Sequence, residues 1–304
     1  MLKKKKLVVV LGPTAIGKTA FSIALANHFH TEIISADSRQ FYRELNIGVA
    51  RPSSMELSSA PHHFIGFLSV KENFSAGDFE RESLATLSAL HAQHDVVVCC
   101  GGSMMYVDAL LYGLDELPSD KELRVAIQHT IANEGLSVMV DELKALDPEY
   151  ARQVDLNNPH RIIRAVEVCR LTGKKYSELR KAATRDREFE IIKIGLTSSR
   201  NWLYNRINLR VDQMMSNGFL EEAKTVYALR DLNALQTVGY RELFEYFDGM
   251  LSIEEAVEKI KQHTRNFAKR QMTWWRRDEK IHWVDLENNS NEGLNQALRQ
   301  IGEG

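Results

Sequence analysis

The side chains best suited to chemistry lie in a glycine-rich stretch near the start of the 304-residue chain. Such a loop wraps backbone amides around phosphate oxygens, its lysine adds a positive charge, and its last hydroxyl can bind Mg²⁺. The sequence therefore predicts a site for a phosphate-bearing substrate, with Mg²⁺ as the cofactor and Thr19 as a magnesium ligand. The stretch consists of Gly12, Pro13, Thr14, Ala15, Ile16, Gly17, Lys18 and Thr19.

The sequence around this loop has the elements that a phosphate loop requires. Leu7 to Leu11 is a short β-branched run that predicts a buried parallel strand, and Gly17 to Phe29 has the apolar spacing of a helix. Strands and helices are then expected to alternate, at Glu32 to Ser35, Phe79 to His91, Asp95 to Cys100 and Met104 to Leu111. The alternation predicts an α/β fold, with a doubly wound parallel sheet that carries the phosphate loop.

The character of the sequence changes between residues 118 and 187, where strand signals disappear and helical patterns dominate. A strand pattern returns at Glu190 to Leu196, and a last short strand is expected at Ile281 to Val284. We therefore expect a core in two parts, 1–117 and 188–304, interrupted by a mainly helical insertion domain at 118–187. Helices are expected in the second part at Trp202 to Ser216, Leu220 to Leu229, Arg241 to Phe247 and Ile253 to Trp275.

An acidic residue is missing where an ordinary ATPase would carry one. The strand Asp95 to Cys100 ends in Gly101 and Gly102, without the carboxylate that helps to bind magnesium in nucleotide hydrolases. The nearest acid near a strand end is Asp37, which we expect beside the phosphate loop because strand ends converge there. Asp37 could be an acid near the magnesium ion, a general base or an ordinary loop residue.

The composition excludes several classes of protein. The chain has 39 Lys and Arg against 41 Asp and Glu, a formal charge of −2, so it has no uniformly basic coat for nucleic acid. Three cysteines provide neither a disulfide framework nor a zinc site, which favours a reducing compartment. No apolar stretch approaches the length that spans a bilayer. We expect a cytoplasmic protein that does not act at a membrane.

Several segments beyond the phosphate loop resemble the tRNA dimethylallyltransferases, the bacterial MiaA family. The resemblance runs in the same order along the chain from about residue 7 to 285 and is far more specific than the loop alone. Its segments are Gly12 to Thr19, Asp37 to Tyr42, Asn46 to Pro52, Pro61 to His63, Phe74 to Phe79, Gly101 to Tyr106, His160 to Ala165, Val238 to Leu243 and Thr264 to Trp275.

The resemblance implies a reaction. The family moves a dimethylallyl group from dimethylallyl diphosphate to the exocyclic amino nitrogen of the adenosine 3′ of the anticodon, in tRNAs that read codons beginning with U. The loop would then bind a prenyl diphosphate, which agrees with the missing ATPase acid. The implied partners are the prenyl diphosphate and the tRNA anticodon stem-loop, and we expect the chain to work as a monomer.

The resemblance also implies roles for single residues. Asp37 is the general base that takes a proton from the attacking amine, and Arg210 binds the diphosphate. Arg206 and Arg210 are four residues apart and share a helix face. Ser103 stands where the family usually has threonine, and its hydroxyl would assist at the reacting centre. Lys18 and the Mg²⁺ bound by Thr19 would stabilise charge on the diphosphate.

Three segments would contact the tRNA by the same resemblance. Basic stretches support this, because residues 161–187 contain nine Lys and Arg and three acids, and 261–277 contain six Lys and Arg and no acid. Two residues depart from the family, since His160 replaces a usual glutamine and Ile16 a usual serine. The expected contacts are Asp37, Ser38, Arg39, Gln40, His160, Arg161, Ile162, Ile163, Arg164, Thr237, Val238, Gly239, Tyr240, Arg241 and Glu242.

Two other enzyme classes stay open from the residues. An adenylate dimethylallyltransferase would act on free AMP or ATP and would not need the helical insertion or its basic segments. A P-loop small-molecule kinase would turn over ATP and would need an acidic magnesium partner at a strand end. A tRNA-binding module without activity would have no use for Lys18 together with Asp37.

Overall fold

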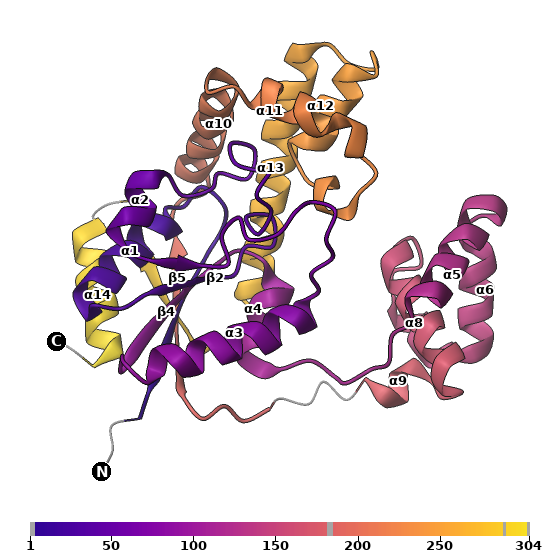
Figure 1. The fold of residues 1–304 in the computed structure, drawn as a ribbon, viewed down its shortest axis with the longest axis horizontal. Coiled ribbons are helices and arrows are strands. Elements are labelled where there is room, and N and C mark those ends of the chain that lie inside the picture. The colour runs from indigo at the N-terminus through magenta and orange to yellow at the C-terminus, as the bar shows by residue number, and fades with distance from the viewer. Residues whose placement is uncertain (1–3, 181–184, 288–289, 303–304) are drawn as a thin grey trace. The chain divides into compact units, whose positions relative to one another are not determined.

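The computed structural model describes residues 4–180, 185–287 and 290–302 and divides into two compact units (Figure 1). Unit 1 is formed by Met1–Leu111 and Arg187–Gly304, and unit 2 by Tyr112–Asp186. Unit 2 begins earlier than the expected insertion, 118–187. The Arg185 amide donates to the Tyr112 carbonyl at 2.8 Å, so the two chain segments at the ends of unit 2 are already joined there.

The described part of unit 1 contains a six-stranded sheet with the order β3-β2-β4-β1-β5-β6. Every neighbouring pair of strands is parallel. A parallel sheet with its first strand in the middle and helical crossovers is doubly wound, so the fold-class prediction is confirmed. The strands are β1 (Lys6–Leu11), β2 (Ile33–Ser35), β3 (His62–His63), β4 (Val96–Cys100), β5 (Glu190–Thr197) and β6 (Ile281–Asp285).

The register of the central strands aligns their carboxyl ends. Val10 of β1 lies opposite Cys100 of β4 and Ile194 of β5. The loops that follow β1 and β4 therefore leave the sheet at the same edge. This edge is where ligands bind in open α/β sheets.

Helices in unit 1 largely follow the predicted positions. The helix expected at Leu220 to Leu229 ends at Val226 and continues as a short 3₁₀ turn, and the helix Ser54–Ser59 was not expected. The helices are α1 (Lys18–Phe29), α2 (Ser54–Ser59), α3 (Ala76–His91), α4 (Met104–Tyr112), α10 (Arg200–Ser216), α11 (Phe219–Val226), α12 (Tyr240–Phe247), α13 (Ile253–Trp275) and α14 (Ser290–Ile301), with 3₁₀ turns at Tyr227–Leu229 and Asn233–Leu235.

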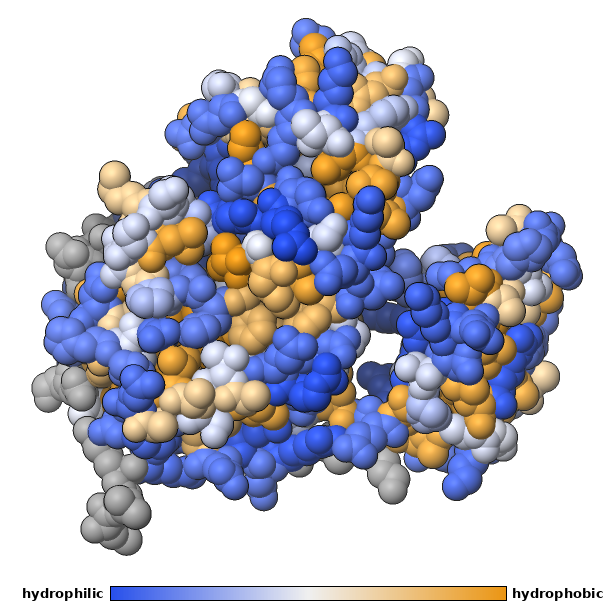
Figure 2. All heavy atoms as spheres, viewed as in Figure 1, coloured by the Kyte–Doolittle hydropathy of each residue, from blue (hydrophilic) through white to orange (hydrophobic). Residues whose placement is uncertain are grey.

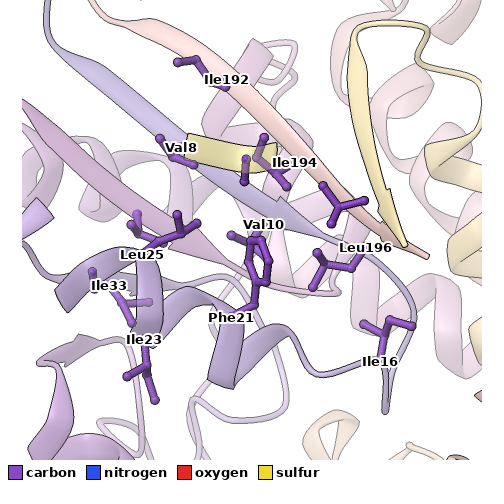
Figure 3. Packing of buried hydrophobic residues seen from close by; sticks show 14 of the residues in the cluster. Val8, Val10, Ile16, Phe21, Ile23, Leu25, Ile33, Ile192, Ile194 and Leu196 are labelled. Carbon is purple, nitrogen blue, oxygen red and sulfur yellow. The ribbon is translucent and has the colours of Figure 1, made fainter. Parts of the chain in front are cut away.

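The main core lies between the sheet and helices α1 and α14. Val8 and Val10 of β1 are fully buried and pack with Phe21 and Leu25 of α1 (Figure 3). Because side chains alternate along a strand, Leu7, Val9 and Leu11 face the other side of the sheet, where α3 and α4 lie (Figure 1). Burial on both faces explains the continuous apolar strand sequences.

A second core in unit 1 holds the helices that follow β5. Phe219, Leu243 and Ile260 come from α11, α12 and α13, and all three are buried. Hydrophilic residues cover most of the face in Figure 2, and apolar side chains are exposed among them. In the part of the chain that the structure describes, no helix has both the length and the apolar character needed to cross a membrane.

Unit 2 is helical in its described residues. Its core contains Ile127, Leu143, Ile162 and Val166, which come from three different helices and are all buried. The helices are α5 (Lys121–Glu134), α6 (Leu136–Leu146), α7 (Pro148–Gln153), α8 (Pro159–Thr172) and α9 (Tyr176–Leu179).

Candidate active site

The glycine-rich loop connects β1 to α1, as its sequence predicts. Gly12 has a φ of 143°, and a Cβ there would lie 2.8 Å from the Leu196 carbonyl oxygen, so this position requires glycine. Gly17 has a φ of 111° and precedes the first turn of α1. Ile16 is 1% exposed and packs into the main core, which accounts for an apolar residue at this point of the loop. The loop thus presents the amino end of α1, a natural anion site.

The Lys18 ammonium forms hydrogen bonds with the backbone of the loop in which it lies. Its Nζ donates to the carbonyl oxygens of Gly12 at 3.0 Å and Pro13 at 2.8 Å. Burial lowers the pKa of Lys18 to about 8, although the nearby Asp37 carboxylate favours the charged form. The lysine is therefore still charged at neutral pH, with its ammonium held in place.

A cavity of about 510 Å³ opens beside the loop. It gathers positive groups from α1 and α10, the Asp37 carboxylate and the ends of two strands. Its lining residues include Thr14, Ala15, Gly17, Lys18, Thr19, Ser35, Asp37, Gln40, Glu56, His62, Cys100, Gly101, Arg206 and Arg210. The structure therefore brings together the phosphate loop, Asp37 and Arg210, which are distant in sequence.

Helix α10 supplies two arginines to this cavity. Arg206 donates from Nε to the Ala15 carbonyl at 2.9 Å, and Arg210 lies with Nη1 3.4 Å from the Thr14 hydroxyl. Burial lowers the pKa of Arg210, and the Asp37 carboxylate opposes this effect. Their spacing of one helical turn places both guanidinium groups against the phosphate loop.

The segment after β2 is fixed on both sides. Asp37 Oδ1 accepts the Arg39 amide at 3.1 Å, and Ser103 Oγ accepts the Ser38 amide at 2.8 Å. Ser103 also donates to the Ser38 hydroxyl at 3.0 Å. Gln40 is buried and donates to the Val49 and Ala50 carbonyls, so its side chain holds a loop of the fold.

An aromatic cluster around Phe41 fixes the segment that follows β2. Phe41 is fully buried and stacks on Phe79 with ring centroids 5.7 Å apart. The edges of Phe67, Phe74 and Tyr106 surround it. Because these rings leave Phe41 little freedom, the residues just before it, including Asp37, have a well-defined position.

The predicted tRNA segment at 237–242 is partly structural. Tyr240 is fully buried and donates to Glu222 at 2.6 Å, and Glu242 is 1% exposed and accepts the Gly239 amide at 2.6 Å. Both side chains are buried, and the expected contact of this segment with RNA stays a prediction. Of this segment, only Arg241 is exposed, while Thr237 and Val238 are half-buried.

The predicted tRNA segment at 160–164 begins α8 in unit 2. Ile162 is fully buried and Ile163 is 7% exposed, and the expected contact of this segment with RNA stays a prediction. The two isoleucines face the core of unit 2 at helical spacing. Arg164 donates to the Leu117 and Pro118 carbonyls and to Glu167. His160 and Arg161 are exposed.

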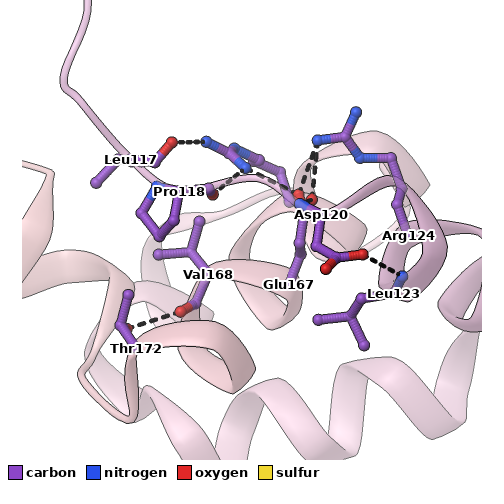
Figure 4. Close-up of polar contacts among 9 residues, drawn as sticks. Leu117, Pro118, Asp120, Leu123, Arg124, Glu167, Val168 and Thr172 are labelled. Carbon is purple, nitrogen blue, oxygen red and sulfur yellow. Dashed lines mark hydrogen bonds and ion pairs between the residues drawn. The ribbon is translucent and has the colours of Figure 1, made fainter.

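Many basic side chains in and around α8 form ion pairs with carboxylates of the protein. Glu167, whose side chain is fully buried, lies 2.9 Å from both Arg124 and Arg164 (Figure 4). Arg170 pairs with Glu142 at 2.6 Å. In the same stretch, Arg185 pairs with Glu116 and Arg187 with Glu80, both at 2.9 Å. Lys181 lies outside the described residues. The count of basic residues therefore overstates the positive surface.

Two residues of the site were missed by the sequence reasoning. His62 lines the cavity, with Nδ1 2.8 Å from the Ala60 carbonyl. Gln271 of α13 is 1% exposed and bonds to the phosphate loop. Both lie in segments that carry the family resemblance, so the motifs were visible in the sequence. Their contacts were not, because they join distant parts of the chain.

The cavity offers oxygen donors that suit magnesium, beside His62 and Cys100. Thr19, Ser35 and Asp37 present oxygen atoms, and Mg²⁺ prefers oxygen ligands and keeps several waters. Among the described residues there is no group of three or more His, Cys, Asp or Glu that could hold a metal ion. A divalent cation bound here would share its ligands with a substrate, as at other phosphate loops.

A family model described as IPP transferase matches residues 40–278. The chain is 51% identical over 284 residues to tRNA dimethylallyltransferase 1 of Bacteroides fragilis, which covers 93% of this chain and 94% of the relative.

The chain belongs to the IPP transferase family.

Other relatives agree over the whole length. A tRNA dimethylallyltransferase of Flavobacterium johnsoniae is 48% identical over 304 residues and covers 98% of each chain. The crystal structure of a tRNA isopentenylpyrophosphate transferase from Bacillus halodurans has a TM-score of 0.72 and 34% identity, over 99% of this chain and 97% of that one. A eukaryotic dimethylallyltransferase acting on tRNA has a TM-score of 0.81 and 26% identity, over 98% and 78%.

These similarities confirm the family resemblance, and with it the prediction of a transferase that moves a dimethylallyl group to tRNA. The alternatives of an adenylate prenyltransferase and a kinase are not favoured. The roles of Asp37, Ser103, Arg210 and the RNA-contacting residues stay predictions.

Proposed function

We propose that this protein transfers a dimethylallyl group from dimethylallyl diphosphate to the exocyclic amino nitrogen of the adenosine 3′ of the anticodon. The observation that carries this proposal is the cavity in which Lys18, Arg210 and Asp37 meet. A bond from carbon to oxygen breaks as diphosphate leaves, and a bond from the same carbon to nitrogen forms. The amine proton goes to a base.

The phosphate loop and α10 hold the leaving group. Lys18 exchanges its two carbonyl partners for phosphate oxygens, and Arg206 and Arg210 add guanidinium donors from the other side of the loop. Charge builds up on the diphosphate as the carbon to oxygen bond breaks. Fixed positive groups stabilise that charge in the transition state and require no rearrangement.

Asp37 is the base in this mechanism. An exocyclic adenine amine is a poor nucleophile, so a carboxylate that accepts its proton lowers the barrier. One oxygen of Asp37 is held by the Arg39 amide, which fixes the orientation of the carboxylate. The Ser103 hydroxyl bonds to the amide and the hydroxyl of Ser38, the residue that follows Asp37.

Mg²⁺ is the cofactor that the residues of the cavity fit. Thr19 would bind it through its hydroxyl, together with oxygens of the diphosphate. When bound, the ion would neutralise part of the negative charge of the leaving group. Thr19 also follows Lys18 at the start of α1, so the hydroxyl and the ammonium would bind the same anion.

The tRNA anticodon stem-loop is the proposed acceptor. The exposed side chains of the predicted segments are His160, Arg161 and Arg241, which offer surface for RNA. Arg39 follows Asp37 by two residues, and its guanidinium donates to the Asn233 and Ala234 carbonyls. The target base must leave its stack to reach Asp37. We propose that the protein works as a monomer in the cytoplasm, where its tRNA substrate is found.

A transfer assay with three acceptors tests the proposed function. The purified protein is incubated with Mg²⁺, radiolabelled dimethylallyl diphosphate, and either unmodified tRNA with adenines at the last anticodon position and the next two, or AMP, or ATP. Label in tRNA alone supports the proposal. Label in AMP or ATP identifies an adenylate prenyltransferase, and consumption of ATP without transfer identifies a kinase.

A further inference from the structure

Gln271 of α13 bonds to two loops of the cavity, the phosphate loop after β1 and the loop after β4. Its Oε1 accepts the Thr14 amide at 2.8 Å, and its Nε2 donates to the Gly102 carbonyl at 2.9 Å. The side chain is 1% exposed. A primary amide is well suited to this place, because it can accept from one loop and donate to the other at the same time.

The fit around Gln271 is tight. A Cβ on Gly102 would lie 2.4 Å from Gln271 Nε2 and 3.6 Å from Lys18 Nζ. Glycine at this position therefore allows the amide to reach the backbone. The Thr14 amide donates to Gln271 and not into the cavity, so this amide of the phosphate loop serves to fix the loop's position.

The Gly102 side of this link continues toward the proposed base. Ser103 follows Gly102 and bonds to the amide and the hydroxyl of Ser38. Asp37 precedes Ser38. A continuous chain of hydrogen bonds and single peptide steps thus leads from the phosphate loop through Gln271 and Ser103 to Asp37.

Helix α13 is itself anchored to the other groups of the site. Arg265 donates to Asn208 at 2.6 Å, and Asn208 lies on α10 between Arg206 and Arg210. His263 lies 2.6 Å from the buried Glu242. Helix α13 therefore contacts both loops through Gln271 and the arginine-bearing helix α10 through Arg265, so it fixes their positions relative to one another.

We propose that Gln271 is a positioning residue that sets the separation between the bound diphosphate and the Asp37 carboxylate. The proposal rests on the proposed function. Transfer requires the allylic carbon, the amine and the base to be aligned, and an error of about 1 Å costs about 100-fold in rate. Gln271 does not touch the reacting atoms, so its effect falls on kcat and not on substrate binding.

The test compares Gln271→Met with the wild-type protein in the tRNA transfer assay. Methionine has a similar length and keeps the packing, but it can neither accept from Thr14 nor donate to Gly102. We expect kcat to fall about 10- to 100-fold, while KM for dimethylallyl diphosphate and for tRNA stays within about twofold. Gln262→Met, an exposed glutamine on the same helix, is the matched control and should be fully active.

A second test changes Gly102, the loop residue whose carbonyl accepts from Gln271. Gly102→Ala keeps Gln271 but crowds its Nε2, so it should lower kcat in the same way. Gln271→Ala removes the crowded group. If the two residues act together, the double variant Gly102→Ala with Gln271→Ala is no slower than Gln271→Ala alone. This test stays informative if Gln271→Met does not fold.

Three outcomes would overturn the proposal. They are an unchanged kcat in Gln271→Met, additive losses in the double variant, and a loss confined to KM for the diphosphate, which would make Gln271 a residue that only shapes the binding loop. A wild-type protein that transfers nothing to tRNA would instead overturn the proposed function.

Discussion

The cavity of unit 1 and the basic stretch of unit 2 use the same residue types in opposite ways. In the cavity, Arg206 and Arg210 bond to an oxygen of the backbone and a hydroxyl of the phosphate loop. In unit 2, Arg164 and Arg170 bond to the carboxylates of Glu167 and Glu142. The partners of Arg206 and Arg210 are uncharged oxygens, so these two arginines can still bind an added anion. Arg164 and Arg170 are already paired with carboxylates of the fold.

The difference shows that a basic run in a sequence is not by itself a nucleic-acid surface. A carboxylate is a strong partner for arginine, and a fold that supplies one leaves less of the guanidinium for phosphate. The RNA contacts of unit 2 should therefore come from residues such as Arg161 and Lys174, which are exposed.

The largest effect is expected from Asp37→Asn. The amide keeps the size of the side chain but cannot take a proton, so transfer should fall about 10²- to 10⁴-fold. Single-turnover transfer to tRNA measures the loss, and filter binding of tRNA should change little. Asp141→Asn, an exposed acid of unit 2, is the control. Wild-type turnover of Asp37→Asn would remove this carboxylate from the mechanism.

The next effect concerns the pH dependence of anion binding. The pKa of Lys18 is lowered to about 8 in the ligand-free cavity, and a bound diphosphate should raise it. Below pH 8 the lysine is charged in both states. Above pH 8 the ligand-free protein loses this proton, so binding must take one up, and affinity should fall by up to about tenfold per pH unit.

Calorimetric titration with inorganic diphosphate between pH 7 and 9.5 measures this dependence. Lys18→Met is titrated beside it, because that variant reports the ionisation of the ligand alone. The ratio of the two affinities should decline above pH 8. A ratio that is constant over the whole range would contradict the prediction.

A smaller effect is expected on the stability of unit 2. Glu167 is buried and accepts from Arg124, from Arg164 and from the Asp120 amide. Glu167→Gln weakens all three bonds, and because both arginines are partly exposed we expect a loss of about 1–2 kcal/mol in the free energy of unfolding. Urea denaturation measures it. Glu178→Gln, which changes an exposed acid, should lower the free energy of unfolding less. An equal loss in the two variants would mean that the bonds of Glu167 add no more stability than an exposed acid does.

The smallest effect is expected on the salt dependence of tRNA binding. Arg161→Met removes an exposed charge and should reduce the slope of log Kd against log salt by about 0.7–0.9, the value for one phosphate contact. Arg164→Met removes a charge that is already bonded to Glu167, and the slope should change less. Equal changes of the slope in the two variants would contradict the prediction that an ion pair within the protein weakens the contact of an arginine with phosphate.

Local patterns predicted the elements of this fold well. The strand and helix around the phosphate loop and the long helix Ile253–Trp275 lie where periodicity places them. The strand His62–His63 has only two residues, too few for a period to be visible. The helix Ser290–Ile301 was missed because Gly293 and several asparagines weaken its helical signal.

By itself the sequence determined what depends on near neighbours. The glycines, Lys18 and Thr19 lie close together along the chain, so their joint chemistry could be predicted directly. The position of Asp37 near a strand end placed it beside the loop, and the resemblance added its role as a base, together with Ser103 and Arg210. Only the tertiary structure decided which partner each side chain meets. Gln271 bonds to Thr14 across 257 residues, and Arg164 lies against Glu167 while Arg210 lies at the cavity. The physical reason is that a charge or an amide is defined chemically by its own residue, whereas its binding partner is defined by the packing of distant segments.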